Sequence, residues 1–241
     1  MLRKAMPSSV MCRVLRPRSE RPARREGPIR SDDHAFANGQ AHLRPRNLLD
    51  AVREVASFSG GLQLRSVWRR FAAQSVIGEM VRLSVTARLI NLNSAETVVI
   101  KPGAVIRGII RNEANGSIAI GSCCYIGDDV LISAAERIVI GDSTLVAHGA
   151  QIFDNDTHPL DPFERELHFM SMLGRPNNRT LSIAAAPVRI GRCCWIGMNS
   201  LIMKGVSIGE NTIVAAGSVV TKDLPGAVVA AGNPAVPIKR I

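Results

Sequence analysis

The chain has 241 residues, a formal net charge of +10 and 46% hydrophobic residues, which allows one domain with a substantial core and a shorter additional segment. Nothing near the N-terminus has the apolar run of about 7–15 residues that a signal peptide needs. No stretch reaches the roughly 18 consecutive apolar residues of a membrane-spanning helix. We therefore expect a cytoplasmic protein.

Residues 1–46 carry most of the surplus positive charge. They hold 11 Lys and Arg against 4 Asp and Glu, whereas the rest of the chain holds 19 against 16. They also contain five prolines and little apolar periodicity, so we predict a basic, disordered tail. The alternative is a basic arm that contacts anionic lipid or polysaccharide. We expect no nucleic-acid partner, because no nucleic-acid-binding motif is present and the chain has only nine aromatic residues.

Residues 47–89 have a helical pattern. Asn47 is placed to cap a first helix that ends at Gly60 and Gly61, and a second helix is predicted to begin near Ser66. We interpret this segment as a helical cap that covers the first coil of the following domain and shields its open sheet edge. The alternative is an amphipathic basic helix in peripheral contact with a membrane.

Residues 90–241 repeat an aliphatic residue every six positions. A small or β-branched residue usually follows it four positions later, and the phase slips by two residues between Ile132 and Ile140. Neither the 3.6-residue period of a helix nor the two-residue period of a simple strand fits. A solenoid of three short strands per coil does fit, and it predicts an all-β parallel β-helix. The aliphatic series comprises Ile100, Ile106, Ile120, Ile126, Ile132, Ile140, Val146, Ile152, Ile190, Ile196, Ile202, Ile208, Val214 and Val220.

The cysteines fit the same repeat. Adjacent pairs stand in the matching segments IGSCCYIG and IGRCCWIG, a poor spacing for metal ligands. Cys124 and Cys194 fall on the small inward position. We therefore predict that they fill the core.

The repeat is interrupted after Ile152 and resumes after Pro187, with a loop assigned to residues 159–187. Long insertions in a repeat array are more often functional than not. His158 stands at the root of the loop. Asp154, Asn155 and Asp156 lie within four residues upstream, and any of them could fix the tautomer of the imidazole.

At five places the chain resembles the hexapeptide-repeat acyltransferases, particularly their sugar O-acetyltransferase branch, which includes maltose, galactoside and nodulation acetyltransferases. The resemblance covers roughly residues 100–241. It implies a left-handed β-helix, acetyl-CoA as donor, no metal, a homotrimer, and active sites in the clefts between subunits. The segments that carry it are DTHPLDP (156–162), APVRIGRCCWIG (186–197), GVSIG (205–209), VAAGSVVTKDLP (214–225) and AGNPAVPIKRI (231–241).

By motif position, His158 resembles the general base of that family, with Asp156 assigned beside it. Histidine suits such work because its ring exchanges a proton near neutral pH. The backbone N–H of Met198 corresponds to the donor that stabilises the tetrahedral oxyanion.

The resemblance also suggests how acetyl-CoA is bound. Trp195 corresponds to a tryptophan that lines the family's cleft, and its alternative role is packing on the coil surface. Val236 stands where the sugar acetyltransferases often carry an arginine, so we do not expect the phosphate contact that this arginine would make. The assigned donor-binding residues are Trp195, Gly197, Ala216, Gly217, Ser218, Thr221, Lys222, Lys239 and Arg240.

The acceptor side departs from the sugar acetyltransferases. An asparagine of the family is replaced by Gly127 or Asp128, and the loop after His158 is several residues longer. The closest analogy is to the polysaccharide-biosynthesis acetyltransferases, with a small-molecule, nucleotide-linked or lipid-linked sugar as acceptor. The assigned acceptor-binding residues are Asp128, Asp154, Asn155 and Arg165.

Three alternatives use the same solenoid. The first is an N-acetyltransferase of an amino sugar or an antibiotic acetyltransferase. The second is a γ-class carbonic anhydrase, which needs three zinc-binding histidines, whereas only His148 and His158 fall on predicted coils. The third is a non-catalytic scaffold, which the retained DTHPLDP loop disfavours.

Overall fold

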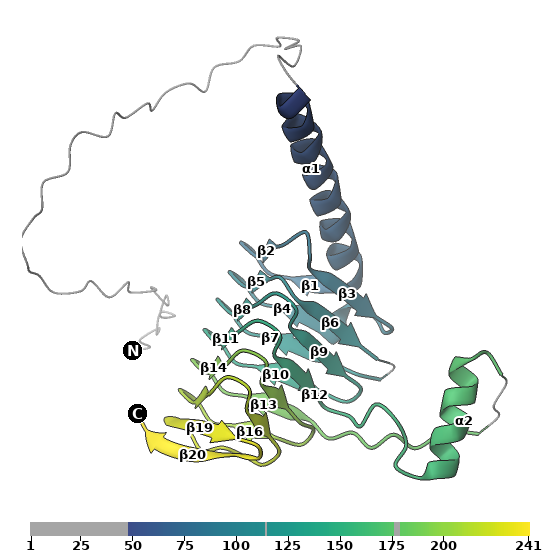
Figure 1. The fold of residues 1–241 in the computed structure, drawn as a ribbon, viewed down its shortest axis with the longest axis vertical. Helices are drawn as coiled ribbons and strands as arrows, with labels where there is room; N and C mark the ends of the chain where they lie inside the picture. Colours follow the sequence, from purple (N-terminus) through teal and green to yellow (C-terminus); the bar gives the residue numbers. More distant parts are fainter. Residues whose placement is uncertain (1–47, 114, 176–178) are drawn as a thin grey trace, which may run out of the picture. The chain divides into compact units, whose positions relative to one another are not determined.

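The structure is a computed structural model that describes residues 48–113, 115–175 and 179–241, with side chains from residue 61 onward (Figure 1). The basic tail, Asn47 and Cys12 lie outside the described residues. No helix within the described ranges is long and apolar enough to cross a membrane.

The segment assigned as a cap differs from its prediction. One helix, α1, runs through Leu48–Gln74 without ending at Gly60 and Gly61. Each glycine in an exposed helix costs only about 1 kcal/mol relative to alanine. Packing of the last turns of α1 outweighs the cost of the two glycines. Phe71 is fully buried, and Leu64 and Val67 on the same face pack against the core of the first coil. The β-helix then begins at Val76 rather than at residue 90.

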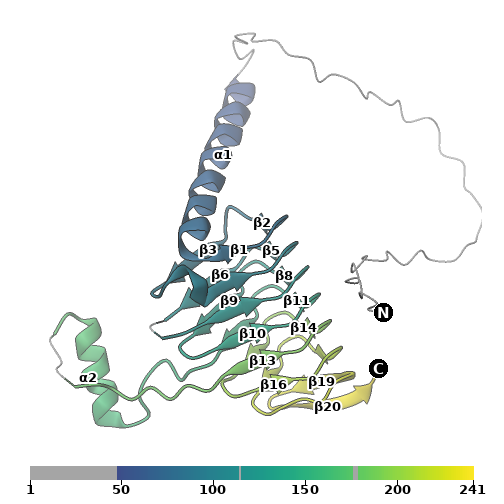
Figure 2. The same cartoon turned by 180° about the vertical axis from the view of Figure 1, so that it is seen from behind.

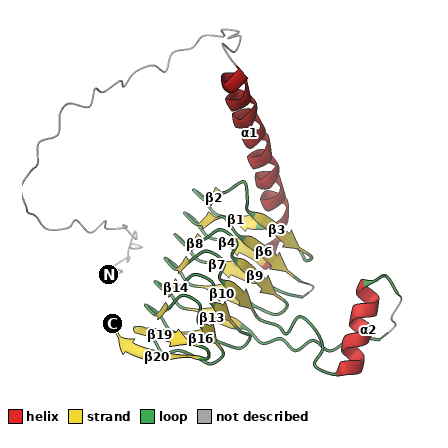
Figure 3. Cartoon of the chain, viewed as in Figure 1, coloured by secondary structure: helices red, strands yellow, loops and turns green. Residues whose placement is uncertain are grey.

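The rest of the chain forms a left-handed parallel β-helix with three strands per coil (Figures 1 and 3). A short 3-10 helix, Ala95–Thr97, precedes the second coil. In chain order the coil strands are β1 Val76–Ile77, β2 Arg82–Leu83, β3 Arg88–Asn91, β4 Val98–Ile100, β5 Val105–Ile106, β6 Ile109–Asn112, β7 Ile118–Ile120, β8 Tyr125–Ile126, β9 Leu131–Ala134, β10 Ile138–Ile140, β11 Leu145–Val146, β12 Gln151–Phe153, β13 Val188–Ile190, β14 Trp195–Ile196, β15 Leu201–Ile202, β16 Ser207–Ile208, β17 Ile213–Val214 and β18 Val219–Val220.

Strands stack into three sheets. The first sheet is β1-β4-β7-β10-β13-β16, the second contains β2-β5-β8-β11-β14-β17, and the third is β3-β6-β9-β12-β15-β18. The turns that connect the second sheet to the third sheet form a column that we call edge 2–3. The column that leads from the third sheet to the first is edge 3–1.

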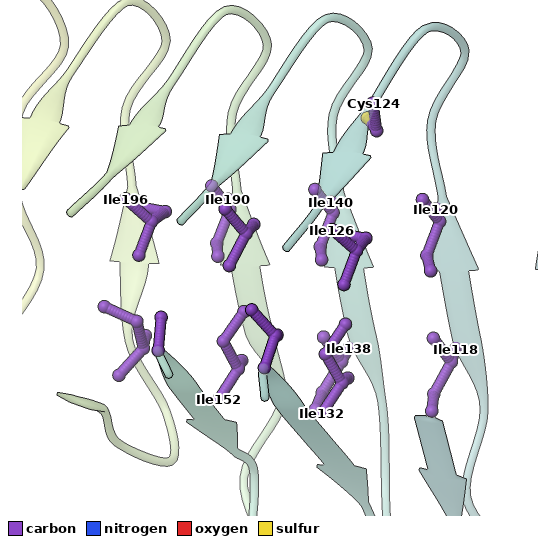
Figure 4. Close-up of a cluster of buried hydrophobic side chains, with 14 of the residues drawn as sticks. Ile118, Ile120, Cys124, Ile126, Ile132, Ile138, Ile140, Ile152, Ile190 and Ile196 are labelled. Carbon is purple, nitrogen blue, oxygen red and sulfur yellow. The ribbon is translucent and has the colours of Figure 1, made fainter. Parts of the chain in front are cut away.

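The six-residue register is confirmed. Each aliphatic residue of the series is at most 3% exposed, and pairing is in phase, for example Ile140 with Ile190 and Ile120. Figure 4 shows these side chains stacked in columns between the strands. Each coil therefore needs the coils above and below it to complete the burial of its apolar face.

The small inward positions connect adjacent coils. Cys124 is 1% exposed, and its Sγ donates to the carbonyl of Gly141 at 3.1 Å. Thr144, one coil further, donates to the carbonyl of Gly191 at 2.9 Å. Cys194 then donates to the carbonyl of Gly209 at 3.2 Å. These positions satisfy buried carbonyls as well as filling space, because a thiol or hydroxyl can donate where alanine cannot.

Edge 3–1 explains the two-residue slip and the position of the loop. Asp154 is fully buried, and its carboxylate accepts the N–H groups of Ala135 at 2.7 Å and Glu136 at 2.9 Å, within the slipped turn of the coil above. Asn155 forms an antiparallel bridge with Ala185, so the chain leaves and re-enters the solenoid through one neck.

Two elements lie outside the regular coils. Helix α2, Pro162–Met172, occupies the loop and has no buried residue; both views draw it away from the stacked sheets (Figures 1 and 2). After the last coil, β19 Val228–Gly232 pairs in parallel with β17, and β20 Ala235–Arg240 turns back antiparallel to β19.

The cysteine pairs predict selective labelling. Burial raises the pKa of Cys124 to about 11 and also raises that of Cys194, whereas Cys123 and Cys193 are exposed. Because the thiolate is the nucleophile, iodoacetamide at pH 8 should alkylate Cys123 and Cys193 and spare their neighbours. Peptide mass spectrometry would measure this, with unfolded protein as the fully labelled control. Equal labelling within each pair would contradict the burial.

Asp154→Ala should destabilise the fold, because two backbone N–H groups lose a charged acceptor. We expect a loss of about 2–4 kcal/mol in the free energy of unfolding, measured by urea denaturation. Asp129→Asn is the matched control, since Asp129 is exposed, and should change stability by less than about 0.5 kcal/mol. Equal stability of both variants would show that the neck does not depend on Asp154.

Candidate active site

His158 is presented by a strained turn at the loop root. Thr157 has φ +62°, and the N–H of His158 donates to the carbonyl of Asp156 at 2.7 Å, which is the pattern of a γ-turn with a left-handed central residue. A β-branched residue seldom adopts this conformation, and such strain is concentrated at functional sites. The resulting His158 side chain is exposed. The Thr157 turn carries no recognisable sequence signal, and sequence reasoning missed it.

The turn is anchored from the next coil. Lys204, on the connection between β15 and β16, donates to Asp156 Oδ1 at 2.6 Å. The Asp156 side chain is only 14% exposed, and its Oδ2 is buried without a hydrogen-bond partner among the described residues. Asp156 therefore holds the loop root to the solenoid and keeps one acceptor unused. Lys204 was not identified from the sequence.

Three residues assigned to the acceptor have structural contacts instead. Asp154 is fully buried with both oxygens occupied, as described above. Asn155 is 6% exposed; its Nδ2 donates to Asp154 Oδ1 and its Oδ1 accepts the N–H of Thr157. Arg165 donates through Nη1 to the carbonyls of Pro159 and Leu160, at 3.2 and 2.9 Å. Within this chain, Asp154 and Asn155 face the protein interior, and Arg165 holds the loop.

A second imidazole lies against His158. Nδ1 of His168, on α2, is 3.1 Å from Nδ1 of His158, and the ring centroids are 5.1 Å apart at an interplanar angle of 59°. Asp161 caps α2 by accepting the N–H of Glu164, and Pro162 occupies the first turn. That capping pattern is readable from the sequence and would have revealed the helix. The loop thus folds back so that α2 places His168 against His158 at the start of the loop.

The assigned donor residues of the fifth coil lie on a different part of the solenoid. Trp195, the first residue of β14, is 52% exposed, and Met198, on edge 2–3, is 50% exposed. The N–H of Met198 donates to none of the described residues, so it remains available to an outside acceptor. Gly197 serves stacking, because a Cβ there would lie 2.5 Å from the backbone N of Ala216.

The next turn of edge 2–3 carries Ala216, Gly217 and Ser218. Gly217 has φ +70° and open space where a Cβ would stand, and Ala216 is exposed, so the backbone is accessible to an extended ligand. Ser218 is 2% exposed, and its Oγ accepts the N–H of Gly232, which gives it a structural contact.

The remaining donor residues are dispersed. Thr221 and Lys222 are exposed on edge 3–1, below the loop root, and Lys239 and Arg240 are exposed on β20. The assigned set therefore does not form one site in a single chain. It follows both edges of the solenoid toward its C-terminal end.

Asp128 lies on edge 2–3 above Met198. It accepts Arg107 Nε at 2.9 Å and Thr86 Oγ1 at 3.3 Å, and His148 Nδ1 is 3.9 Å away. The hydrogen bond from Arg107 lowers the pKa of Asp128 below its usual value. These side chains form a polar column with one member per coil. It leads toward Met198 and not toward His158.

The site residues of one chain thus divide between two edges. His158, Asp156 and Lys204 occupy edge 3–1, whereas Met198 and Gly217 occupy edge 2–3. No group of three or more His, Cys, Asp or Glu side chains in the described part of the chain could hold a metal ion.

Known proteins resemble this chain in sequence and fold. The bacterial transferase hexapeptide (six repeats) family matches residues 187–222. A putative colanic acid biosynthesis acetyltransferase, WcaF, of Escherichia coli (strain K12) is 30% identical over 63% of this chain and 71% of its own length. Galactoside O-acetyltransferase of the same organism is 36% identical over 52% and 55%.

The chain spans less than two thirds of several relatives, between 55% and 66% of three that are 36–38% identical. Among solved structures, a mutant of AntD, an N-acyltransferase from Bacillus cereus in complex with dTDP and coenzyme A, superposes with a TM-score of 0.55. It is 21% identical and covers 68% of this chain and 83% of its own, a likeness of fold. By its hexapeptide register, its loop and these relatives, the chain belongs to the hexapeptide-repeat acetyltransferase family.

Proposed function

We propose that the protein is an acetyl-CoA-dependent O-acetyltransferase that acts on a hydroxyl group of a sugar or saccharide. The observation that carries this proposal is the exposed imidazole of His158, held at a strained and anchored loop root. The family relatives named as acetyltransferases support the reaction class. The fold alone would not, because one fold supports many chemistries.

In this reaction His158 accepts the proton of the acceptor hydroxyl while the hydroxyl oxygen bonds to the thioester carbonyl carbon. The free N–H of Met198 donates to the carbonyl oxygen as negative charge develops there. As the C–S bond breaks, the proton held by His158 passes to the leaving thiolate. The products are the acetyl ester and free coenzyme A, with no covalent enzyme intermediate.

The donor fits the open turns of edge 2–3. Gly217 and Ala216 leave room for an extended pantetheine chain along the backbone, and Trp195 offers an apolar face one coil away. Lys222, Lys239 and Arg240 are exposed cations for phosphate groups.

We infer that the working unit is a homotrimer. The general base and the oxyanion donor lie on different edges of one chain, so a second copy must bring its edge 2–3 against edge 3–1 of the first. Three such contacts close a ring, the expected outcome for a cyclic oligomer of a prism. Asp128 and its column would then line the acceptor side of the same cleft.

The acceptor class is a saccharide, either free, nucleotide-linked or lipid-linked. Release of thiol from acetyl-CoA should be measured with free sugars, nucleotide sugars, amino sugars and antibiotics as acceptors. Turnover with hydroxyl acceptors and none with amines would support O-acetylation. Turnover restricted to amines would reject it in favour of N-acetylation.

His158→Ala should lower kcat by roughly 10²–10⁴-fold, the usual contribution of a general base. The affinity for acetyl-CoA, measured by calorimetry, should stay nearly unchanged, because the donor turn of Ala216 and Gly217 lies on edge 2–3 whereas His158 lies on edge 3–1. A variant with full activity would remove His158 from the mechanism.

Mixed trimers should regain activity from two inactive variants. Ala216→Trp places a bulky side chain at an exposed donor position and should block acetyl-CoA binding, whereas His158→Ala removes the base. Each mixed ring contains one cleft of three with both intact edges, and random refolding of equal amounts makes about three quarters of the rings mixed. About one quarter of wild-type activity should therefore return. Mixtures without recovery, while each parent remains trimeric, would contradict a site shared between subunits.

A further inference from the structure

We propose that His168 is the positioning residue of this site, and that it fixes the tautomer of His158 through the Nδ1–Nδ1 hydrogen bond. The inference rests on the proposed function, in which His158 is the general base. It assigns His168 a role in the chemistry of the base, whereas its place in the loop alone would suggest a role in acceptor binding.

The geometry allows only one proton between the rings. At 3.1 Å, one Nδ1 must donate and the other must accept, since neither two lone pairs nor two N–H groups form a hydrogen bond. If His158 Nδ1–H donates to His168, the Nε2 of His158 keeps a free lone pair. If His168 donates instead, His158 carries its proton on Nε2 and cannot take another from an acceptor.

Only the first arrangement makes His158 a base at Nε2. The hydrogen bond at one ring nitrogen decides which tautomer an imidazole adopts, and many catalytic histidines use a carboxylate or backbone carbonyl for this purpose. Among the described residues, His158 Nδ1 has the ring of His168 as its partner. A neutral ring can also receive this N–H bond when His158 becomes positively charged in the reaction.

The loop is built to hold the two rings together. The γ-turn at Thr157 fixes the backbone of His158, and Asp161 caps the helix that carries His168. Arg165, from the first turns of that helix, donates to the carbonyls of Pro159 and Leu160, directly after His158. These contacts close the segment between the two histidines. They also explain why Arg165 contacts the loop backbone.

The test compares two substitutions of His168. His168→Phe keeps a planar ring and removes both nitrogens. His168→Asn offers a carboxamide oxygen near the former position of Nδ1 and can accept the same N–H bond. Met172→Ala, at an exposed position on the same helix, is the control for general effects on α2.

The first measurement is the tautomer of His158 by ¹⁵N NMR, which needs no substrate. We expect a protonated Nδ1 and a bare Nε2 in the wild-type protein, in His168→Asn and in Met172→Ala. In His168→Phe the proton should move to Nε2. A wild-type His158 already protonated at Nε2, or an unchanged tautomer in His168→Phe, would overturn the proposal.

The second measurement is steady-state kinetics. His168→Phe should lower kcat about 10- to 100-fold with the KM for acetyl-CoA within about twofold, and His168→Asn should recover most of the loss. Full activity of His168→Phe beside an inactive His158→Ala would reject the positioning role and leave the proposed function intact. Full activity of His158→Ala would instead reject the proposed function, while the NMR result would still decide the pairing.

Discussion

The stacking of each coil on the next is the interaction on which the whole structure depends. A single coil is too thin to bury its inward aliphatic residues by itself, so neighbouring coils complete their burial, as the columns of Figure 4 show. Backbone pairing follows the same direction, with every coil strand bonded to strands of adjacent coils. Residues inserted into the six-residue register must therefore lie outside the stacked coils. The long loop and its helix leave the solenoid for this reason.

That constraint determined how much could be predicted. The period of six gave the fold and the buried series, and it placed Cys124 and Cys194 in the core, because each position has one allowed direction. It could not give the end of α1, since packing of Phe71 against the first coil outweighs the glycine pair. Nor could it give α2, because a segment outside the repeat follows its own capping signals, here Asp161 and Pro162.

The site was predictable in part for the same reason. His158 was identified from a motif at the boundary of the repeat, where the adjoining coil fixes the position of the backbone. Its neighbours were harder to assign, because sequence proximity does not distinguish a side chain that faces a cleft from one that faces a turn. Asp154 is one residue from Asn155 and two from Asp156, yet it binds the backbone of another coil. Lys204 was invisible, since its contact with Asp156 crosses 48 residues of sequence.

The two ends of the solenoid are covered by different elements, and these coverings limit pairing with other copies of the chain. Helix α1 packs its last turns on the first coil, and β20 turns back antiparallel along β19 at the other end. A bare terminal coil would present rows of unpaired N–H and C=O groups in register with those of any other copy. Stacks of parallel strands with a fixed spacing then have no natural limit to growth, which is the geometry of a cross-β fibre. In this chain, the same regularity that makes the fold stable makes its end structures a safeguard against filament formation.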